Sequence, residues 1–571
     1  MTTVEADLTK EIATQSEWIP EPIPEHEAQL RAAGVDPDLA PFLARRGVDT
    51  AEGAERFLEP RLEDLLPTRS LPGIEQAVGR LLMALDRSER VAIVGDYDAD
   101  GVTGTALLSA CFDLAGLENE CLLPHRLRDG YGFQLAQLER AQELGCSLLV
   151  TVDCGMSSHE ALAEAEKVGV DVIVTDHHLP GEEMPRAAAV VNPRLEPDGR
   201  SHDNPALSGA GAALKLGMAL LEAIGREPPT MSLLRVACIG TIADLVELEG
   251  ENRVIASLGL QALGQVRSPG LRALLDVARV KRPVSSDDIG FRIGPRINAA
   301  GRLDSPDRAL ELLRTRDPDR ARALASQLDE WNQRRQTEER RVVDAARKHF
   351  EAMSTLPRVL VAWSPEWHRG VVGIAAGRLA KQFNRPTILL QDLGDEATGS
   401  GRSIETVHLH RFLSAWNDEM ERFGGHRQAI GLTVRSDRLE RLRDEWNETA
   451  AQWEAERLVK RYRYEMHCDR LVHVRDHLYP KIQRLQPFGQ GNPAPVLRVG
   501  PIKAARDPRV FGNGHLDLMI EDLEGGRIGL TAWHGAERRS VFTDRFEVLA
   551  RLAWDDYLGT PSLVLVDARA L

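Results

Sequence analysis

Three carboxylates follow one apolar run near residue 95 of the chain. The run 91–95 is short and rich in β-branched residues, as is typical of a buried parallel strand, and Asp96, Asp98 and Asp100 come directly after it. Side chains at alternate positions share a face of extended chain, so Asp96 and Asp98 would converge and repel each other. A divalent cation relieves such repulsion. On this stretch alone, an Asp-rich turn that caps the next helix, over 102–117, remains the alternative.

Three later apolar runs end in similar residue types. The runs and the residues after them are 148–152 with Asp153, 170–175 with Asp176, His177 and His178, and 236–243 with Asp244. We interpret each run as a further strand end. Ligands bind at the carboxyl ends of strands in open α/β sheets, which favours a shared site over a capping turn. Mixed Asp and His ligands suit Mn²⁺ or Mg²⁺, and imidazole favours Mn²⁺.

The elements that must position these residues alternate between strand and helix from about residue 91 to residue 248. Strands are predicted over 91–95, 120–124, 148–152, 170–175 and 188–192, with helices between most of them. This alternation predicts an α/β fold with a mostly parallel sheet and helices on both faces.

Length and composition indicate a large protein without a membrane span. At 571 residues and 43% hydrophobic residues, the chain is expected to form about four domains with packed cores. We find no apolar run of ~18 residues and no signal segment. The six cysteines show no paired spacing, which suits reduced thiols in the cytoplasm.

The net charge of −16 is a weak guide to the ligand, because it is unevenly distributed. Residues 1–65 carry 15 Asp and Glu against 6 Lys and Arg, whereas residues 292–347 carry 13 Arg against 10 Asp and Glu. A local basic groove on an acidic protein can still bind a phosphate backbone.

The second half of the chain contains further glycine- and arginine-rich stretches. The stretch 289–303 is interpreted as irregular, either a turn between domains or a phosphate contact. A helix is predicted over 317–351, whose polar far half would bridge two domains through solvent. Another charged helix is expected over 446–463. The stretches 399–403 and 424–427 are interpreted as loops, either tight turns or anion contacts.

The C-terminal part favours β-structure. Alternating patterns over 495–504, 515–521, 526–534 and 545–554 predict strands of an OB-type barrel, a fold that commonly binds single strands. Phe488, Phe511 and Trp533 are candidates for base stacking, although core packing is the simpler interpretation of each.

Taken together, the motifs resemble the DHH phosphoesterase superfamily, and most closely its single-strand-specific 5′ exonucleases. The resemblance covers about 57–571, and it rests on six motifs. They are Gly95-Asp96-Tyr97-Asp98-Ala99-Asp100-Gly101, Val152-Asp153-Cys154-Gly155, Asp176-His177-His178, Gly240-Thr241-Ile242-Ala243-Asp244, the run from Gly294 to Leu303, and Gly424-Gly425-His426.

The resemblance implies roles for the acidic and imidazole residues. Two ions, Mn²⁺ or Mg²⁺, would activate water, with Asp96, Asp98, Asp153, His177 and Asp244 as ligands and Asp153 as a bridge. Asp176 would orient His177, and His178 would contact the scissile phosphate. The role of Asp100 stays open. Members of the superfamily often carry a histidine shortly before the first Asp pair, where this sequence has Ile93-Val94-Gly95.

The resemblance also implies nucleic-acid contacts and a domain plan. The contact residues would be Arg126, Arg296, Asn298, Arg302, Ser400, Arg402 and His426. The expected domains are 1–70, an N-terminal arm and short helices; 71–250, the DHH catalytic domain; 251–353, a helical linker; 354–455, the DHHA1 domain; and 465–571, an OB-like single-strand-binding domain.

The function implied is degradation of single-stranded DNA from the 5′ end to mononucleotides in recombination and repair. The main alternative is a DHH phosphoesterase with a small substrate, such as a pyrophosphatase or a short-oligonucleotide phosphodiesterase, which would not need residues beyond about 450. A non-enzymatic replication scaffold of the same fold and an α/β nucleotide-binding or redox domain are further alternatives. A single-strand binding protein and a helicase are conceivable partners, but no motif indicates either.

Overall fold

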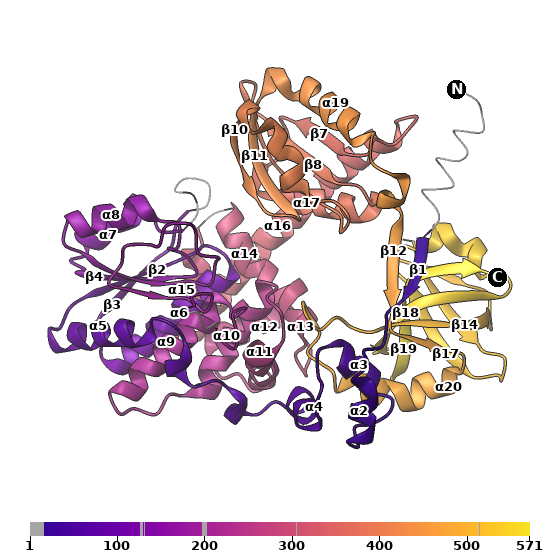
Figure 1. Ribbon diagram of the computed structural model, residues 1–571, viewed down its shortest axis with the longest axis horizontal. Helices are drawn as coiled ribbons and strands as arrows, with labels where there is room; N and C mark the ends of the chain where they lie inside the picture. Colours follow the sequence, from indigo (N-terminus) through magenta and orange to yellow (C-terminus); the bar gives the residue numbers. More distant parts are fainter. Residues whose placement is uncertain (1–15, 126–129, 131, 197–201, 304, 513) are drawn as a thin grey trace. The chain divides into compact units, whose positions relative to one another are not determined.

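The computed structural model describes residues 16–125, 130, 132–196, 202–303, 305–512 and 514–571. The chain divides into two compact units (Figure 1). One contains Pro20–Asp329 and Arg463–Leu571, and the other contains Glu330–Tyr462 with the short segment before Pro20.

The α/β domain of the first unit is built on a five-stranded parallel sheet. Its strands, in spatial order, are β3 (Asn119–Leu122), β2 (Val91–Gly95), β4 (Leu148–Val152), β5 (Asp171–Thr175) and β6 (Ala189–Val191). Each neighbouring pair is parallel. β2 and β4 are buried along their whole length, as expected for strands covered on both faces. The predicted α/β class with a parallel sheet is confirmed.

Helices pack on both faces of this sheet (Figure 1). α7 (Leu135–Glu143) and α8 (His159–Lys167) share a hydrophobic core with β2, β4 and β5. On the other side α6 and α9 pack together, α5 packs on α9, and α10 packs on α6, α9 and α11. The bounds are α5 (Ile74–Asp86), α6 (Ala99–Ala115), α9 (Gly209–Ala223), α10 (Thr230–Ala243), α11 (Gly250–Leu263), α12 (Pro269–Val277), α13 (Ser286–Asp288) and α15 (Asp307–Arg314).

Two predictions for this domain are wrong. The run 236–243 is the second half of helix α10 rather than a strand. It is apolar almost throughout because other helices surround it, and periodicity alone cannot separate a buried helix from a buried strand. The stretch 289–303 is helical rather than irregular, with a π-helical turn, η4 (Ile289–Ile293), followed by α14 (Gly294–Leu303). Gly294 and Gly301 allow close packing and do not interrupt the helix.

The C-terminal part forms a seven-stranded sheet that contains the predicted strands. In spatial order they are β13 (Met466–Cys468), β14 (Val496–Ala504), β18 (Phe546–Asp555), β19 (Thr560–Ala570), β17 (Arg527–Ala532), β16 (His515–Glu521) and β15 (Arg509–Phe511). An additional β14–β16 pairing closes the sheet on itself, as in a barrel. α20 (Leu471–His473), the π-helical turn η8 (Val474–Leu478) and α21 (Tyr479–Gln483) lie between β13 and β14 in the sequence.

The N-terminal helices share one hydrophobic core with this barrel. They are α2 (Glu27–Ala32), α3 (Ala40–Arg45) and α4 (Ala51–Leu58). Leu30, Phe42 and Phe57 belong to the same buried cluster as Leu497 and Leu530 of the barrel. The expected N-terminal domain is therefore not independent, because residues 30–57 share the hydrophobic core of the C-terminal barrel.

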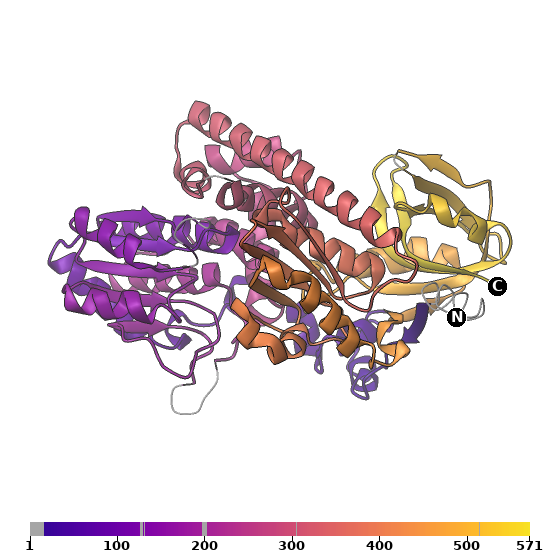
Figure 2. The same ribbon diagram turned by 90° about the horizontal axis from the view of Figure 1, so that it is seen from above.

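The second unit is an α/β domain entered through one long helix. α16 (Pro318–Glu351) runs without a break, as predicted (Figure 2). A five-stranded sheet follows, in the spatial order β10 (Met420–Gly425), β11 (Ala429–Arg435), β9 (Glu396–Arg402), β8 (Thr387–Asp392) and β7 (Leu360–Ser364). α17 (Arg369–Phe383) packs on it with the end of α16, and α18 (Leu409–Leu413) and α19 (Leu439–Ala450) belong to a separate core cluster. β12 (Lys460–Tyr464) pairs with β1 (Ser16–Pro20).

Three expectations for this unit need correction. The polar half of α16 is not solvated all round, because Asn332, Arg335 and Glu339 are buried and Arg335 donates hydrogen bonds to the other two. The charged helix expected over 446–463 ends at Ala450. The stretch 399–403, expected as a loop, lies largely in β9, where small residues are needed because a Cβ on Gly399 would lie 2.1 Å from the Leu389 carbonyl oxygen.

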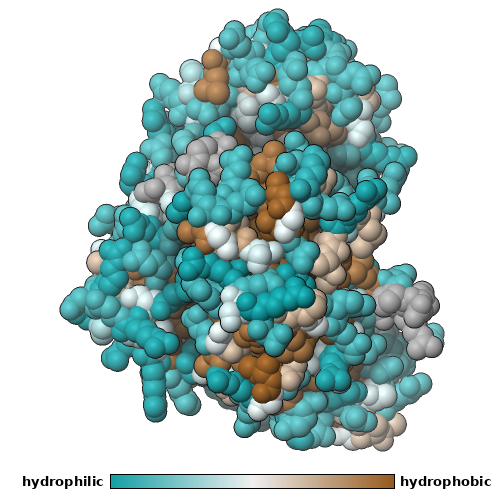
Figure 3. Space-filling model, turned by 90° about the vertical axis from the view of Figure 1, so that its left-hand side faces the viewer, coloured by the Kyte–Doolittle hydropathy of each residue, from teal (hydrophilic) through white to brown (hydrophobic). Residues whose placement is uncertain are grey.

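The exterior is that of a protein with many charged side chains. On the face seen in Figure 3, hydrophilic side chains surround small apolar patches. None of the helices in the described ranges is long and apolar enough to cross a membrane.

Candidate metal centre

The aspartates that follow the three neighbouring strands β2, β4 and β5 lie at the same level of the sheet. The amide of Asp96 donates to the Val152 carbonyl at 3.2 Å, and the amide of Asp153 donates to Thr175 at 3.0 Å. The amide of Asp176 continues the series, donating to Val191 at 3.0 Å. The parallel register therefore places the three aspartates side by side across the end of the sheet, as the strand-end pattern predicted.

Asp153 occupies the middle of this row in a strained conformation. Its φ of +62° lies in the left-handed region, which non-glycine residues seldom adopt. A Cβ on Gly209, the first residue of α9, would lie 2.6 Å from the Asp153 carboxylate. Only glycine at this position lets α9 approach so closely. The glycine-rich stretch near 209 thus serves helix packing beside the site.

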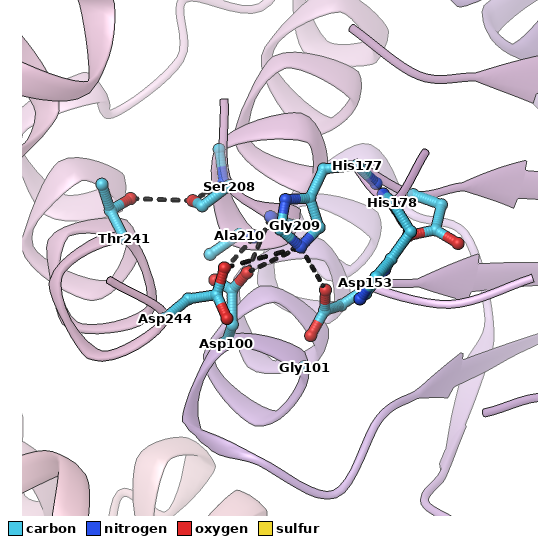
Figure 4. A network of polar contacts seen from close by, with 12 residues as sticks. Asp100, Gly101, Asp153, His177, His178, Ser208, Gly209, Ala210, Thr241 and Asp244 are labelled. Carbon is cyan, nitrogen blue, oxygen red and sulfur yellow. Dashed lines mark hydrogen bonds and ion pairs between the residues drawn. The ribbon is translucent and has the colours of Figure 1, made fainter. Parts of the chain in front are cut away.

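The N-terminus of α6 carries the other two acidic residues of the first motif. Asp98 is its N-cap and accepts hydrogen bonds from the amides of Asp100 and Gly101. Asp100 points away from its own helix and accepts from the amides of Gly209 and Ala210, at 2.7 and 3.0 Å (Figure 4). A capping turn and convergent carboxylates therefore coexist here, and Asp100 ties α6 to α9.

Asp244 reaches the site from the C-terminal end of α10, not from a strand. The ring nitrogen Nε2 of His177 lies 3.6 Å from its carboxylate, 3.0 Å from that of Asp153 and 4.0 Å from that of Asp100 (Figure 4). A hydroxyl pair, Ser208 with Thr241 at 2.9 Å, joins α9 to α10 behind them. Neither hydroxyl was identified from the sequence, which offers no signal that separates them from other buried polar residues.

Potential ligand atoms gather in three overlapping groups among the described residues. The atoms of each group lie within 4.8 Å of one another, and the groups are Asp96, Asp98 and Asp153; Asp153, His177 and His178; and Asp100, His177 and Asp244. The oxygen and imidazole donors fit a divalent cation of the Mn²⁺ or Mg²⁺ type. Each ligand residue expected from the sequence thus belongs to at least one of these groups, and Asp153 and His177 each belong to two.

The electrostatics of the cluster also fit a cation site. Burial, followed by the charge of Asp98, raises the pKa of Asp244 to about 7. Burial and the neighbouring carboxylates raise the pKa values of Asp153 and Asp100 well above their usual range. Burial, with the charge of His178, lowers the pKa of His177 to about 4, so its imidazole is neutral and able to coordinate. A bound dication would relieve the repulsion that these shifts express.

Asp176 orients His178 rather than His177, contrary to expectation. Its Oδ1 lies 2.7 Å from Nδ1 of His178 and accepts the amides of both histidines, while Oδ2 accepts the amide of Met156. Burial alone would lower the pKa of His178, but the hydrogen bond and charge of Asp176 outweigh it and raise that pKa. About half of the His178 side chain is exposed, so the imidazole that Asp176 holds faces outward at the edge of the cluster.

The residues expected to contact nucleic acid fall into three groups. Arg126 lies outside the described residues. Arg296, Asn298 and Arg302 lie on α14, in the same unit as the ligand cluster. Ser400 and Arg402 lie on β9 and His426 follows β10, in the other unit.

Two of the α14 residues make contacts within the fold. Arg296 forms an ion pair with Asp329, at 2.6 Å, and the side-chain carbonyl of Asn298 accepts the amide of Ala99. In the other unit, a Cβ on Gly373 of α17 would lie 3.0 Å from Nη2 of Arg402 and 3.3 Å from Oγ of Ser400. Ser400 and Arg402 therefore sit together beside α17, while His426 is exposed.

Family models match three parts of this chain. The DHH family N-terminal domain matches residues 90–241, the DHHA1 domain residues 356–452, and the RecJ OB domain residues 470–566. The fold and the site thus define a DHH-family protein with an additional OB domain.

Individual relatives narrow the assignment. The single-stranded-DNA-specific exonuclease RecJ of Salmonella typhimurium is 35% identical over 93% of this chain and 95% of its own. The crystal structures of RecJ from Thermus thermophilus with Mn²⁺ and with Mg²⁺ have TM-scores of 0.83 and 0.77. They are 30% and 29% identical, and cover 97% of this chain and 80% and 78% of theirs. The chain belongs to the RecJ family of single-stranded-DNA-specific exonucleases, which confirms the resemblance.

Proposed function

We propose that this protein is a divalent-metal-dependent exonuclease that degrades single-stranded DNA from the 5′ end to mononucleotides in recombination and repair. The observation that carries the proposal is the largely buried group of Asp and His donors at the ends of β2, β4, β5 and α10. Phosphodiester hydrolysis needs a strong nucleophile at neutral pH and stabilisation of negative charge, and such a donor set provides for both through bound cations.

Two overlapping ligand sets would hold two ions, Mn²⁺ or Mg²⁺. Asp96, Asp98 and Asp153 would form one set, and Asp153, His177 and Asp244 the other. Bound there, such ions lower the pKa of a water and clamp the attacking and leaving oxygens. The chain has no histidine directly before Asp96, so the first set depends on carboxylates alone.

His178 would stabilise the charge that develops on the scissile phosphate. The bond to Asp176 holds its ring and raises the pKa of the imidazole, and the exposed part of the ring faces outward from the cluster. A fixed hydrogen-bond donor at the edge of a cation site suits an anionic transition state.

The 5′ end would be recognised by basic and hydroxyl side chains. Arg126, Arg302, Ser400 and Arg402 are the candidates for a terminal phosphate, with His426 as an additional contact. Ser400 and Arg402 lie together on β9, which supports a shared ligand. Guanidinium groups match phosphate oxygens in bidentate geometry.

The OB barrel would bind the strand through an exposed aromatic group. Trp533 is 58% exposed, with its ring 4.9 Å from His515 and 6.1 Å from Phe511. Phe511 and His515 come from paired strands, and Arg506 and Arg509 lie nearby, bonded to Asp517 of the same sheet. Phe488 packs on the barrel core, so it is withdrawn as a stacking candidate. Aromatic faces with basic side chains around them are typical of single-strand binding.

We also propose the compartment in which the protein acts and the proteins it acts with. All six cysteines are free, five of them buried, which suits a reducing cytoplasm. A single-strand binding protein and a helicase would be suitable partners, since each brings single strands to such an enzyme. The alternative, a phosphoesterase with a small substrate, would not need the C-terminal barrel. The barrel is nevertheless an integral part of this fold, because it shares a large hydrophobic core with the N-terminal helices.

End-labelled oligonucleotides test the proposal. With Mn²⁺ or Mg²⁺, a 5′-phosphorylated single strand carrying a 5′ label should release labelled mononucleotide at once, whereas a 3′ label should stay in long fragments until late. Blunt duplex should resist. Digestion that begins at 3′ ends, equal cutting of duplex, or activity restricted to pyrophosphate would each reject the proposal.

A further inference from the structure

The first amide of α6 is satisfied by a side chain 199 residues away. The N–H of Ala99 donates to Oδ1 of Asn298 at 2.7 Å, while the next two amides donate to Asp98. The first amides of a helix have no partner within the helix and need one from elsewhere. Asn298 therefore completes the cap of the helix that carries Asp98 at its start.

Helix α14, which carries Asn298, lies directly against the first acidic motif. A Cβ on Gly301 would be 2.7 Å from the carbonyl oxygen of Tyr97, between Asp96 and Asp98. Only glycine allows this approach, because any larger residue would push the helix or the motif backbone aside. Asn298 and Gly301 thus fix one side of the motif through backbone contacts, and neither contact uses a ligand oxygen.

The same helix is itself held in place. Arg296 donates from Nε to Asp329 at 2.9 Å and its Nη2 lies 2.6 Å from the same carboxylate oxygen. Both side chains are mostly buried, with exposed fractions of 14% and 17%. Nη1 of Arg296 donates to the Arg292 carbonyl at 2.7 Å, so all three guanidinium nitrogens have partners within the fold. Asp329 belongs to α16, which therefore anchors α14.

We propose that Asn298 is a positioning residue for Asp96 and Asp98, and that α14, anchored by the Arg296–Asp329 pair, supports the first metal-ligand motif. This inference rests on the proposed metal-dependent chemistry. Without the Asn298 oxygen, the Ala99 amide loses its partner and the start of α6 shifts to find another. Both ligand carboxylates move with it. Removing a group bonded directly to a metal ligand typically weakens metal binding about 10- to 100-fold, and we expect the lower end of that range for this backbone contact.

The test compares Asn298→Ala with Asn298→Asp in the full chain. Mn²⁺ binding is measured by titration calorimetry without DNA, and single-strand binding by fluorescence anisotropy in chelator. We expect Asn298→Ala to weaken Mn²⁺ binding by about 10-fold or more while single-strand affinity is unchanged. Asn298→Asp keeps an acceptor oxygen at the same atom and should restore most of the Mn²⁺ affinity. Arg308→Ala, an exposed substitution on α15, is the control and should change neither.

The opposite pattern would overturn the inference. If Asn298→Ala leaves Mn²⁺ affinity intact and weakens single-strand binding, Asn298 is a nucleic-acid contact. If Asn298→Ala does not fold, Asp329→Ala decides instead, with a smaller loss of Mn²⁺ affinity expected and an unchanged affinity contradicting the inference. Failure of the wild type to degrade DNA, with Asn298-dependent Mn²⁺ binding retained, would reject the proposed function and leave this inference standing.

Discussion

Replacing Asp244 by Asn should stabilise the metal-free protein at alkaline pH. Burial and the neighbouring Asp98 raise the pKa of Asp244 to about 7, so the folded protein keeps a proton that the unfolded chain releases near pH 4. Ionising this carboxyl inside the cluster costs free energy. Asn has nearly the same shape and never ionises, so the variant avoids that cost.

The size and sign of the effect follow from linkage. Between the unfolded and folded pKa values, the folded state binds one more proton than the unfolded state, so the free energy of unfolding falls as pH rises. The stability that the wild type owes to this retained proton is fully present below pH ~4 and is lost by the time the pH passes about 7. From pH 5 to pH 7 the slope of ~1.4 kcal/mol per pH unit amounts to about 3 kcal/mol.

Urea unfolding in chelator, at pH 5 and at pH 8, measures this difference. The stability of Asp244→Asn relative to the wild type should increase by about 3 kcal/mol between the two pH values. Saturating Mn²⁺ at pH 8 should reverse the order, because the wild type binds the cation with an additional ligand.

Two results would refute this reasoning. A stability difference that does not change with pH would mean that Asp244 is not held in a repulsive cluster. An equal gain from Mn²⁺ in the two proteins would mean that Asp244 is not a ligand.

Three further outcomes are expected. Asp153→Ala should abolish hydrolysis of single strands, while the affinity of the protein for single strands stays within ~2-fold in a binding assay. The reason is that cleavage of the P–O bond uses the ligand cluster and binding does not. Residual turnover above ~1% would contradict this. Trp533→Ala should weaken single-strand binding by about 1–3 kcal/mol. Tyr557→Ala, which removes a still more exposed aromatic side chain in another turn of the barrel, should not, and equal losses would remove the stacking argument. Arg253→Met should destabilise the protein by about 3 kcal/mol in urea unfolding, because the buried guanidinium donates to the Phe57, Leu485 and Gln486 carbonyls; a loss below ~1 kcal/mol would contradict that role.

The parallel sheet and most of the metal cluster could be predicted from the sequence. Strands ending in Asp153 and in Asp176 carry a local signal, because buried strands are apolar and parallel strands expose ligands at their carboxyl ends. The register that levels Asp96, Asp153 and Asp176 follows from the same pairing. Asp244 was assigned correctly to the cluster by position but on the wrong element, since a helix buried on all sides is as apolar as a strand.

Other features depend on contacts between distant segments and leave no local signal. The hydrogen bond from Ala99 to Asn298 joins residues 199 positions apart in the sequence. Phe42 and Leu530, which share a core, are more than 480 positions apart. The bond from Asp176 to His178 depends on a rotamer that spacing does not determine. In the polar half of α16 the local signal is misleading. Arg335 and Glu339 look like solvated charges in the sequence, but they are buried and form an ion pair.

The most direct test of the metal centre is the anomalous scattering of Mn²⁺ in a crystal of this protein. The account predicts two peaks roughly 4 Å apart, one beside Asp96 and Asp98 and one beside His177 and Asp244, with the Asp153 carboxylate between them. A single peak that does not touch Asp153, or Mn²⁺ bound elsewhere with the cluster empty, would contradict it.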